Sequence, residues 1–411
     1  MDEIHKNGKI INYDGLKVIF IQGSNYEMGF QFGYLLKEEL LQNRRAWLNF
    51  FKRRLGLEKK DFLETWEKIK GFIPKEYIQE IRGRADAVGL KFEDLAILES
   101  VGMVTSSKVG CSSMAAWGSA TSNGELYHLR SQDLPLDAIT DPITKKKAYE
   151  NIVVVVRKPN DGFASIYPSS PFSIGIEGGF NNKGICIGWN LSMCKYHKLG
   201  GIPIALRQLM VLDHTSSLND AVRIVNNNRN IGCSIVISDS KKPDAIVIEQ
   251  NPNHYYVGSW DDPIESAGIF WKINDVVRRT NFFISPKLLK NQRNLLGPKF
   301  LKNLLSNQKL FLWLFSPLFR HYVGLSKGIE KNLGNLDITK TMDVLRSTYK
   351  GETDTLFSFI QKIFKIQKSW DQWVACPKTG DLLISFAQNG KNAFESPIHH
   401  INFFELLNSK K

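Results

Sequence analysis

The sequence predicts an α+β protein in which helices pack on antiparallel sheets, and three observations lead to that class. Within the first 110 residues, apolar residues recur at helical spacing with charges between them over 26–51, 59–72 and 75–89. From Cys111 onward the chain changes to short apolar runs separated by polar turns, the pattern of strands. No period of roughly 20 to 50 residues recurs, which excludes a repeat fold. A helical front followed by a strand-rich body is typical of layered α+β proteins.

The N-terminal part carries clear start and stop signals. A strand-like piece, LKVIFIQG at 16–23, comes first. The stretch IPKEYIQEIRGRADAVG then has a proline at the start of a helix and a glycine at its end. We therefore expect a mainly helical segment over residues 1–110.

The remainder reads as antiparallel hairpins. MAAWGSAT and LYHLRSQ flank SNGE, which is a hairpin turn. One helix, SSLNDAVRIVNNN at 216–228, opens on a serine cap and interrupts the strands. Further strands are expected in NIVVVVRK, GICIGWNLS, CSIVISD, DAIVIEQ and HYYVGSW.

Composition excludes several classes of protein. The 411 residues are 43% hydrophobic and 23% charged, which suits a folded globular chain rather than a disordered one. The net charge of +13 is spread along the sequence, and no nucleic-acid motif accompanies it, so we expect no nucleic-acid partner. The five cysteines form no CxxC pair, and no histidine stands at metal-ligand spacing. We therefore expect no disulfide framework, no metal and no cofactor.

The expected cellular location rests on two features that the sequence lacks, a secretory signal and a membrane-spanning stretch. The N-terminus MDEIHKNGKIINYDG has no apolar core of a secretory signal, so we expect a cytoplasmic protein. No stretch reaches the roughly 20 apolar residues that span a bilayer. The section 285–331 has nine Lys or Arg against one acid and encloses LFLWLFSPLF. Two interpretations of it stay open: a buried helix pair, or a cationic, aromatic surface for lipid or a fatty acyl chain, with peripheral membrane contact.

The most informative stretch is KVGCSSMAAWGSA at 108–120, where a lone cysteine follows a glycine. A hairpin of this length returns Arg130 and Asp133 to the start of the first strand, beside Cys111. A neighbouring cation lowers the pKa of a thiol from about 8.5, and Arg130 is placed to do so. The same guanidinium is expected to help keep Asp133 ionised.

The hairpin lacks an evident base. His128 has the opposite strand parity to Asp133 and is expected to point away, while a distant histidine stays open as a partner. The other candidate is the α-amine of Cys111, whose ordinary pKa of about 7.7 to 8.0 suits proton transfer. That amine exists only if the Gly110-Cys111 bond is cut, and glycine lacks the Cβ that would obstruct attack on its carbonyl. A small buried cysteine without chemistry is the plain alternative.

These residues resemble a known family. VGCSSMAAWGSATSNGELYHLRSQD is similar to the start of the mature chain in N-terminal nucleophile (Ntn) hydrolases of the choloylglycine hydrolase, acid ceramidase and aminopenicillanate acyltransferase group, especially the last. GSNYEMGFQFGYLL and residues 73–98 resemble its propeptide, and GGFNNKGICIGWN and RTNFF resemble segments that carry active-site asparagines. The likeness covers most of the chain, including WVACPKTGDLLISFAQNG, and is weak over about 295–365.

The resemblance implies a four-layer αββα sandwich and a set of site residues. Cys111 would be the nucleophile and, through its freed amine, the base. Arg130 and Asp133 would position and polarise it. Asn190 would donate to the oxyanion, and Asn281 would orient the amine or the substrate carbonyl.

One further candidate residue and two departures from the family pattern accompany this assignment. Arg293 is a weaker candidate for a further arginine of the family. Gln132 and Leu134 stand where the family has an asparagine and an aromatic residue beside its aspartate, which puts the local substrate contacts in doubt.

The implied function is that of an autoproteolytically activated zymogen, an amide hydrolase or acyltransferase acting on linear amides through a Cys111 thioester. Residues 1–110 would be the propeptide or α-subunit and 111–411 the catalytic β-subunit of one heterodimer. The substrate would be a small acyl amide or acyl-CoA with an apolar acyl group, long or aromatic. The alternatives are a conventional Cys-His thiol hydrolase without self-cleavage, and a catalytically silent relative that binds lipid or protein.

Overall fold

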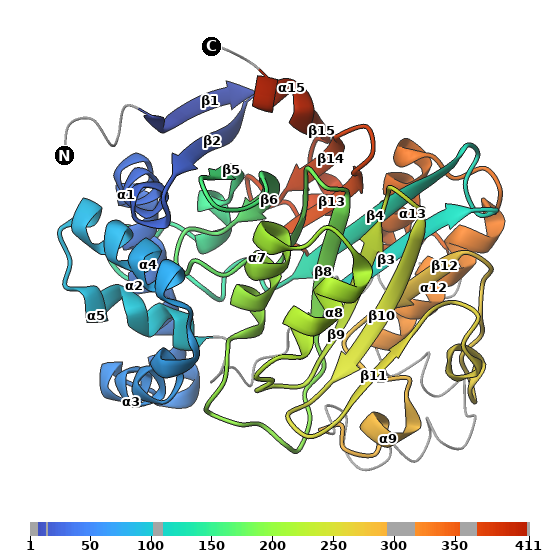
Figure 1. Cartoon of the computed structure of the whole chain (residues 1–411), viewed down its shortest axis with the longest axis horizontal. Helices are drawn as coiled ribbons and strands as arrows, with labels where there is room; N and C mark the ends of the chain where they lie inside the picture. The colour runs from blue at the N-terminus through green and yellow to red at the C-terminus, as the bar shows by residue number, and fades with distance from the viewer. Residues whose placement is uncertain (1–6, 14, 102–109, 294–316, 354–367, 409–411) are drawn as a thin grey trace.

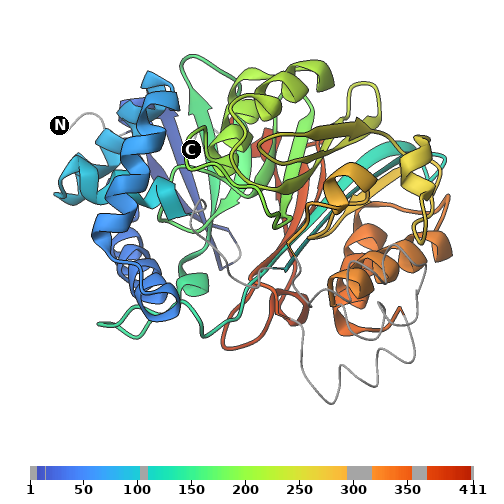
Figure 2. The ribbon, with the colours of Figure 1, turned by 90° about the horizontal axis from the view of Figure 1, so that it is seen from below.

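The computed structural model describes residues 7–13, 15–101, 110–293, 317–353 and 368–408. Two sheets lie face to face, and helices cover the outer face of each, so the layers run helix, sheet, sheet, helix (Figure 1, Figure 2). Helices α7 and α8 pack on one sheet, and α13 packs on the other. The predicted α+β class with a four-layer αββα arrangement is therefore confirmed.

The first sheet contains nine strands among the described residues, and its only parallel pair is β2 with β5. In spatial order its strands are β1 (Lys9–Tyr13), β2 (Leu16–Gly23), β5 (Val153–Pro159), β6 (Ser165–Ser169), β7 (Gly178–Asn181), β8 (Ile185–Leu191), β9 (Cys233–Asp239), β10 (Asp244–Gln250) and β11 (Tyr255–Gly258). The second sheet, with six described strands, runs β12 (Val276–Arg279), β3 (Gly110–Gly118), β4 (Gly124–Asp133), β13 (Asp371–Cys376), β14 (Asp381–Phe386) and β15 (His399–Asn402).

The helices follow the pattern of apolar spacing and caps. Ser217 accepts a hydrogen bond from the backbone N–H of Asp220 and so starts α8, as the serine cap in the sequence predicts. Gly89 ends α4 in the left-handed conformation. The α-helices are α1 (Asn25–Leu35), α2 (Lys37–Leu55), α3 (Lys59–Ile69), α4 (Lys75–Val88), α5 (Phe92–Ala96), α7 (Ile204–His214), α8 (Leu218–Asn226), α9 (Pro286–Leu289), α12 (Pro317–Lys331), α13 (Ile338–Lys350) and α15 (Phe403–Asn408).

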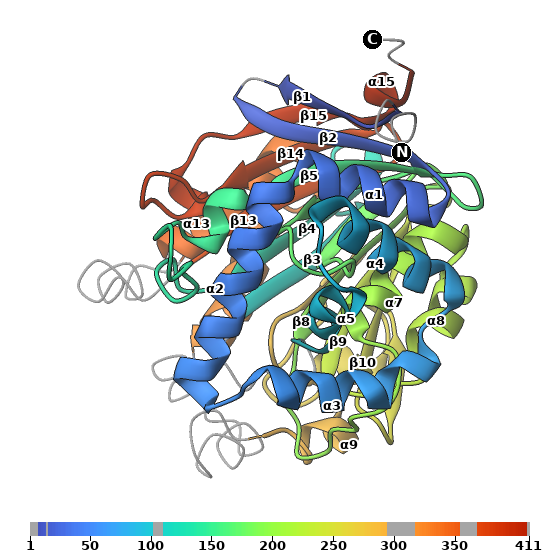
Figure 3. The same cartoon turned by 90° about the vertical axis from the view of Figure 1, so that its left-hand side faces the viewer.

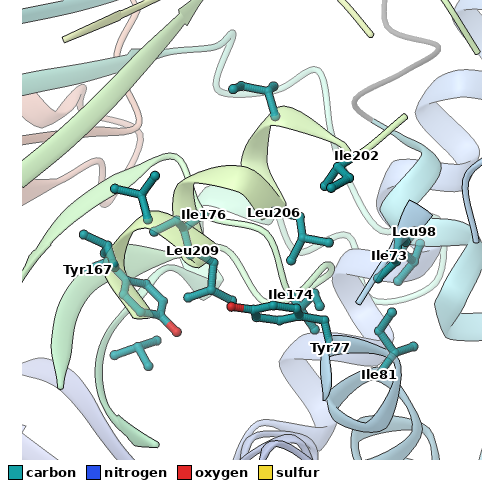
Figure 4. Packing of buried hydrophobic residues seen from close by; sticks show 14 of the residues in the cluster. Ile73, Tyr77, Ile81, Leu98, Tyr167, Ile174, Ile176, Ile202, Leu206 and Leu209 are labelled. Atoms are coloured by element: carbon teal, nitrogen blue, oxygen red, sulfur yellow. The ribbon is translucent and has the colours of Figure 1, made fainter. Parts of the chain in front are cut away.

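The N-terminal segment is built into the body. Its helices stand along one side of the molecule (Figure 3), and β2 pairs with β5, so this segment supplies an edge of the nine-stranded sheet. Ile73, Tyr77 and Ile81 of this segment pack in one apolar cluster with Leu206 and Leu209 of α7 (Figure 4). The strand β1 was not predicted, because KIINY is mostly exposed and shows no buried run.

The β3–β4 hairpin ends earlier than MAAWGSAT suggests. Gly118 has φ +53° and follows a register shift after Ala116. The backbone N–H and hydroxyl of Ser119 both donate to Asp275 Oδ2. The predicted continuation of the strand to Thr121 is therefore wrong. Ser119 hydrogen-bonds to this carboxylate at the point where backbone pairing with β4 would otherwise continue.

The section 285–331 is only partly described. Leu288 and Leu289 of α9 join Phe319 and Tyr322 of α12 in a buried apolar cluster, which agrees with the interpretation as packed helices. The predicted acyl-holding run LFLWLFSPLF lies, up to residue 316, outside the described residues. In the described part of the chain, no helix is long and apolar enough to cross a membrane.

Candidate active site

Cys111 lies near the start of β3, where the hairpin brings it opposite Gln132. Its side chain is buried, with 3% of the residue exposed. Arg130 Nη2 donates to Cys111 Sγ at 3.6 Å, and Asp133 pairs with the neighbouring Gly110. The hairpin therefore brings the thiol and the guanidinium together, as its length predicts, and sets Asp133 beside Gly110.

Arg130 is fixed by the neighbouring sheet. Its Nε and Nη2 donate to the carbonyl of Trp189 at 3.3 and 3.1 Å, and Nη2 also donates to Glu177 Oε2 at 3.0 Å. A Cβ at Gly178 or Gly188 would lie 3.1 Å from Arg130 Cδ. The glycines of GGFNNKGICIGWN thus leave room for the arginine between the two sheets.

The surroundings of Cys111 disfavour its thiolate form. Burial raises the pKa of Cys111 to about 12, and the opposing effect of the Arg130 charge is smaller. Arg130 lowers the thiol pKa, as expected, but the loss of hydration on burial outweighs this one neighbouring cation, so the net shift is upward.

Asp133 sits in a second polar cluster on the α13 side of the sheet. Tyr349 Oη donates to its Oδ2 at 2.6 Å, and Ser131 Oγ donates to its Oδ1 at 2.7 Å. His321 Nδ1 lies 3.7 Å from Oδ2. Burial nevertheless raises the pKa of Asp133 to about 7. Arg130 favours the ionised carboxylate, as expected, but its effect on the pKa of Asp133 is smaller than that of burial.

Tyr349 and His321 are site residues that the sequence reasoning missed. Tyr349 stands 216 positions from Asp133 along the chain, and no local motif marks either residue. Tyr349 also exchanges a hydrogen bond with Ser112 at 3.0 Å, next to the cysteine. Only the packing of α12 and α13 on the sheet brings them there.

The two asparagines take different places. Asn281 Oδ1 accepts from the backbone N–H of Cys111 at 2.5 Å, while its Nδ2 donates to the Leu191 carbonyl. Asn190 is fully buried, and its Nδ2 donates to the carbonyl of Arg279 at 3.3 Å. The structure brings Asn281 to the cysteine, whereas the oxyanion role of Asn190 stays a prediction.

A cavity of about 110 Å³ lies beside Cys111. Residues from the N-terminal segment and from both sheets line it, and most are apolar or aromatic. Trp47, Leu98 and Val101 come from the N-terminal segment, so this segment forms one wall. Asn190 and the described residues of 285–331 are not among the lining residues.

The ionisable Asp, Glu, Lys, Arg and His side chains in the described lining of this cavity are all acidic. Asp371 lies opposite Gln132 in the adjacent strand, so Cys111, Gln132 and Asp371 share one row across three strands. Glu177 and Glu99 complete the carboxyl groups of the lining. Burial raises the pKa of Glu99 and the pKa of Asp371, each to about 7.

The remaining sequence candidates lie elsewhere. His128 Nδ1 is 2.8 Å from Ser238 Oγ, its ring stacks on Trp373, and burial lowers its pKa to about 3. It shares a strand face with Arg130 and points away from Asp133, as parity predicts. Arg293 is exposed, and its backbone N–H donates to Met193 O. Among the described residues, no group of three or more His, Cys, Asp or Glu side chains could hold a metal ion.

The chain is similar to curated proteins over part of their length. It is 24% identical over 271 residues to the protein dcd1B of Dictyostelium discoideum, which covers 60% of this chain and 52% of dcd1B. It is 22% identical over 276 residues to dcd1A of the same organism, covering 60% of each chain. The match thus spans little more than half the length of these relatives.

Solved structures show a weak likeness. An N-acylethanolamine-hydrolyzing acid amidase ortholog of Caenorhabditis elegans matches 71% of this chain and 100% of its own, at 14% identity and a TM-score of 0.42. Penicillin V acylase of Agrobacterium tumefaciens matches 73% of this chain and 88% of its own, at 15% identity and a TM-score of 0.42. Scores at this level carry no conclusion about this chain.

A family model gives the decisive comparison. The model described as acyl-coenzyme A:6-aminopenicillanic acid acyl-transferase matches residues 140–365, more than half of the 411-residue chain. Asn190 and Asn281 fall inside the matched range, while the β3–β4 hairpin with Cys111 precedes it. The resemblance seen in the sequence is therefore confirmed, and the chain belongs to the acyl-coenzyme A:6-aminopenicillanic acid acyl-transferase family.

Proposed function

We propose that this protein is a self-cleaving amide hydrolase or acyltransferase whose nucleophile is Cys111. One observation carries the proposal: Cys111 lines an apolar cavity while Asn281 holds its backbone nitrogen and Arg130 contacts its thiol. Each contact suits a residue that must present both a free amine and a sulfur to a substrate. Membership of an acyltransferase family supports the same chemistry.

The first step frees the amine. Cys111 Sγ attacks the carbonyl carbon of Gly110, the peptide C–N bond breaks, and a thioester joins Gly110 to the sulfur. The thiol proton moves to the departing nitrogen of Cys111. Water then hydrolyses the thioester, which leaves a carboxylate on Gly110 and restores the thiol.

Cleavage also supplies the missing base. In the uncut chain the thiol pKa is raised to about 12, and the side chain that donates to Cys111 Sγ among the described residues is Arg130, not a histidine. A free α-amine has an ordinary pKa of about 7.7 to 8.0, so it can take the thiol proton near neutral pH. Asn281 Oδ1, which accepts from this nitrogen already, would keep the amine oriented.

Turnover of a substrate amide then uses the same sequence of bond changes as self-cleavage. The α-amine accepts the thiol proton, and sulfur attacks the amide carbonyl. The substrate C–N bond breaks, the leaving amine takes the proton from the α-ammonium, and an acyl thioester remains on Cys111. Water resolves the thioester in hydrolysis, and a second amine resolves it in acyl transfer.

We assign the oxyanion donor to Asn190, following the family. Its Nδ2 donates to Arg279 O at 3.3 Å, and its Oδ1 accepts from Ser113 Oγ at 3.2 Å, and both distances lie just beyond the usual range for such bonds. A small rotation of the amide would release Nδ2 toward the carbonyl under attack. A donor of this kind is typically worth about 3 kcal/mol of the barrier.

The cavity favours a substrate with a compact apolar group. A cavity of about 110 Å³ is somewhat smaller than the roughly 150 Å³ space that holds benzene in an engineered protein. The enclosed part of the substrate is then a ring or a short chain. A long acyl chain would have to extend outside it.

Acyl p-nitroanilides with benzoyl, butyryl and hexadecanoyl groups test this function. We expect release of nitroaniline that Cys111→Ala abolishes, with a Cys111-bound acyl group visible by intact mass. Asn190→Ala should slow turnover by about a hundredfold with unchanged melting. Activity of a chain that stays uncut would favour the conventional Cys-His hydrolase. Absence of turnover, of cleavage and of thiol labelling would favour the silent relative.

A further inference from the structure

Asp371 is a buried acid that the proposed chemistry leaves unused. It opens β13 and lines the cavity, with only 2% of the residue exposed. Its Oδ1 has no hydrogen-bond partner among the described residues. A buried carboxylate oxygen without a hydrogen-bond partner is unfavourable, so a ligand that donates to it would gain affinity.

The other carboxyl groups of the cavity are already engaged. Arg130 Nη2 donates to Glu177, and the backbone N–H of Ile174 donates to Glu99 Oε1 at 2.8 Å. The described lining contains no Lys, Arg or His side chain. The Arg130 charge also acts on Asp371, but no hydrogen bond joins the two side chains among the described residues, so Asp371 keeps a carboxylate oxygen that can accept a hydrogen bond from a ligand.

Aromatic rings stand beside this acid. Trp370, Trp47 and Phe172 all line the cavity. The ring centroid of Trp47 lies 5.1 Å from that of Phe172 and 6.3 Å from that of Trp370. Aromatic faces attract ammonium groups, and they also pack against a small apolar body. A carboxylate with an aromatic wall suits an arylalkyl ammonium better than an anion or a neutral amide.

The distance to the nucleophile follows from the sheet. Cys111, Gln132 and Asp371 stand in one row on three neighbouring strands. Two strand spacings are about 10 Å, and side chains of one row project to the same face. One small molecule can therefore reach both Cys111 and Asp371.

We propose that the substrate carries a protonated amine that binds Asp371, together with a small apolar or aromatic group held by Trp47, Phe172 and Trp370. The substrate class is thus an amide with an ammonium group within about 10 Å of the scissile carbonyl. This assignment of a substrate class rests on the proposed function of the cavity.

Binding of a matched pair of ligands tests the proposal without relying on turnover. The ligands are 2-phenylethylammonium and 2-phenylethanol, which have similar size and differ in charge. Their affinities for the purified full chain are measured by isothermal titration calorimetry at pH 8. Wild type should bind the ammonium at least about tenfold more tightly, as a charge-assisted hydrogen bond allows. Asp371→Asn should bring the two affinities to within about twofold.

Glu99→Gln is the matched control, since it removes another buried carboxylate of the same cavity and should keep the preference for the ammonium. Equal binding of both ligands, tighter binding of the alcohol, or no binding of either by wild type overturns the proposal. So does a preference that survives in Asp371→Asn. Failure of self-cleavage would instead count against the proposed function, and intact mass reports that separately.

Discussion

At the scale of residues, Gly110 has a packing role in addition to its place before the nucleophile. A Cβ at this position would lie 2.9 Å from Asp133 Oδ2 and 3.0 Å from Asp133 Cβ. The glycine therefore allows the carboxylate to lie directly against the peptide bond at which we propose cleavage. In the cut chain the same carboxylate would lie beside the new amine.

Gly110→Ala should slow cleavage by about tenfold or more, because the added methyl group displaces Asp133 from this peptide. Gly71→Ala is the control, since Gly71 is exposed and a Cβ there meets no atom within 4 Å. The fraction of cut chain is followed by intact mass over time. Cleavage of Gly110→Ala at the wild-type rate would show that the space left by this glycine does not matter for cleavage.

The raised pKa of Asp371 predicts a dependence of stability on pH. Burial raises the folded-state pKa to about 7 from an ordinary value of 3.8, so the folded chain binds the proton more tightly than the unfolded chain. The stabilisation is present at low pH and is lost as pH rises through about 7. For one such group the loss between pH 5 and 8 is on the order of 2 kcal/mol.

Urea unfolding of Cys111→Ala should therefore show a steeper fall in stability over this range than unfolding of Cys111→Ala with Asp371→Asn. Asp141→Asn serves as the control. The Arg45 guanidinium beside Asp141 holds its pKa well below the ordinary value, so its loss should lower stability equally at pH 5 and pH 8. Identical slopes with and without Asp371 would contradict this account of the carboxyl.

At the scale of elements, α1 and α4 cross at two glycines. A Cβ on Gly29 would lie 2.1 Å from the carbonyl oxygen of Glu80, and a Cβ on Gly83 would lie 2.2 Å from that of Tyr26. Both contacts are with backbone atoms, which cannot move away by a side-chain rotation. This crossing explains the glycines of NYEMGFQFGYLL and EIRGRADAV, which in sequence only weaken a helix.

Gly83→Ala should destabilise the uncut Cys111→Ala chain by about 1 to 3 kcal/mol, because overpacking must separate the two helices. The midpoint of urea unfolding measures the effect. Gly71→Ala, with open space around it, should be neutral or slightly stabilising. An unchanged unfolding midpoint for Gly83→Ala would show that the two helices can separate without loss of stability.

The sequence predicts elements and local pairs better than it predicts the site. The hairpin length places Arg130 and Asp133 beside Cys111, and the structure agrees. Tyr349 and Asp371 come from elements far along the chain, so no local pattern could indicate them. The thiol pKa could not be anticipated either, since it depends on burial that only the assembled layers create.

At the scale of the whole molecule, the N-terminal segment is both a structural layer and part of the cavity wall. Its strand β2 pairs with β5, and Trp47 and Leu98 line the cavity. Arg157 of β5 also forms a buried ion pair with Glu80 of α4 at 2.8 Å. A cut after Gly110 would leave all these contacts in place.

The two cut chains should therefore remain together. Size-exclusion chromatography in native buffer is expected to give one peak that contains both, and denaturing buffer should separate them. The physical reason is the extent of the apolar cluster that the segment shares with α7 and the nine-stranded sheet. Elution of a free N-terminal chain in native buffer would contradict the expectation that this packing holds the two chains together.

Intact mass spectrometry of purified wild type after incubation at neutral pH tests the central claim most directly. The account predicts two species whose masses place the cut between Gly110 and Cys111, with the second chain starting at the cysteine. Cys111→Ala should remain one species of full length. Wild type that also stays at full length, or a cut at any other bond, would contradict the claim that Cys111 becomes an N-terminal nucleophile.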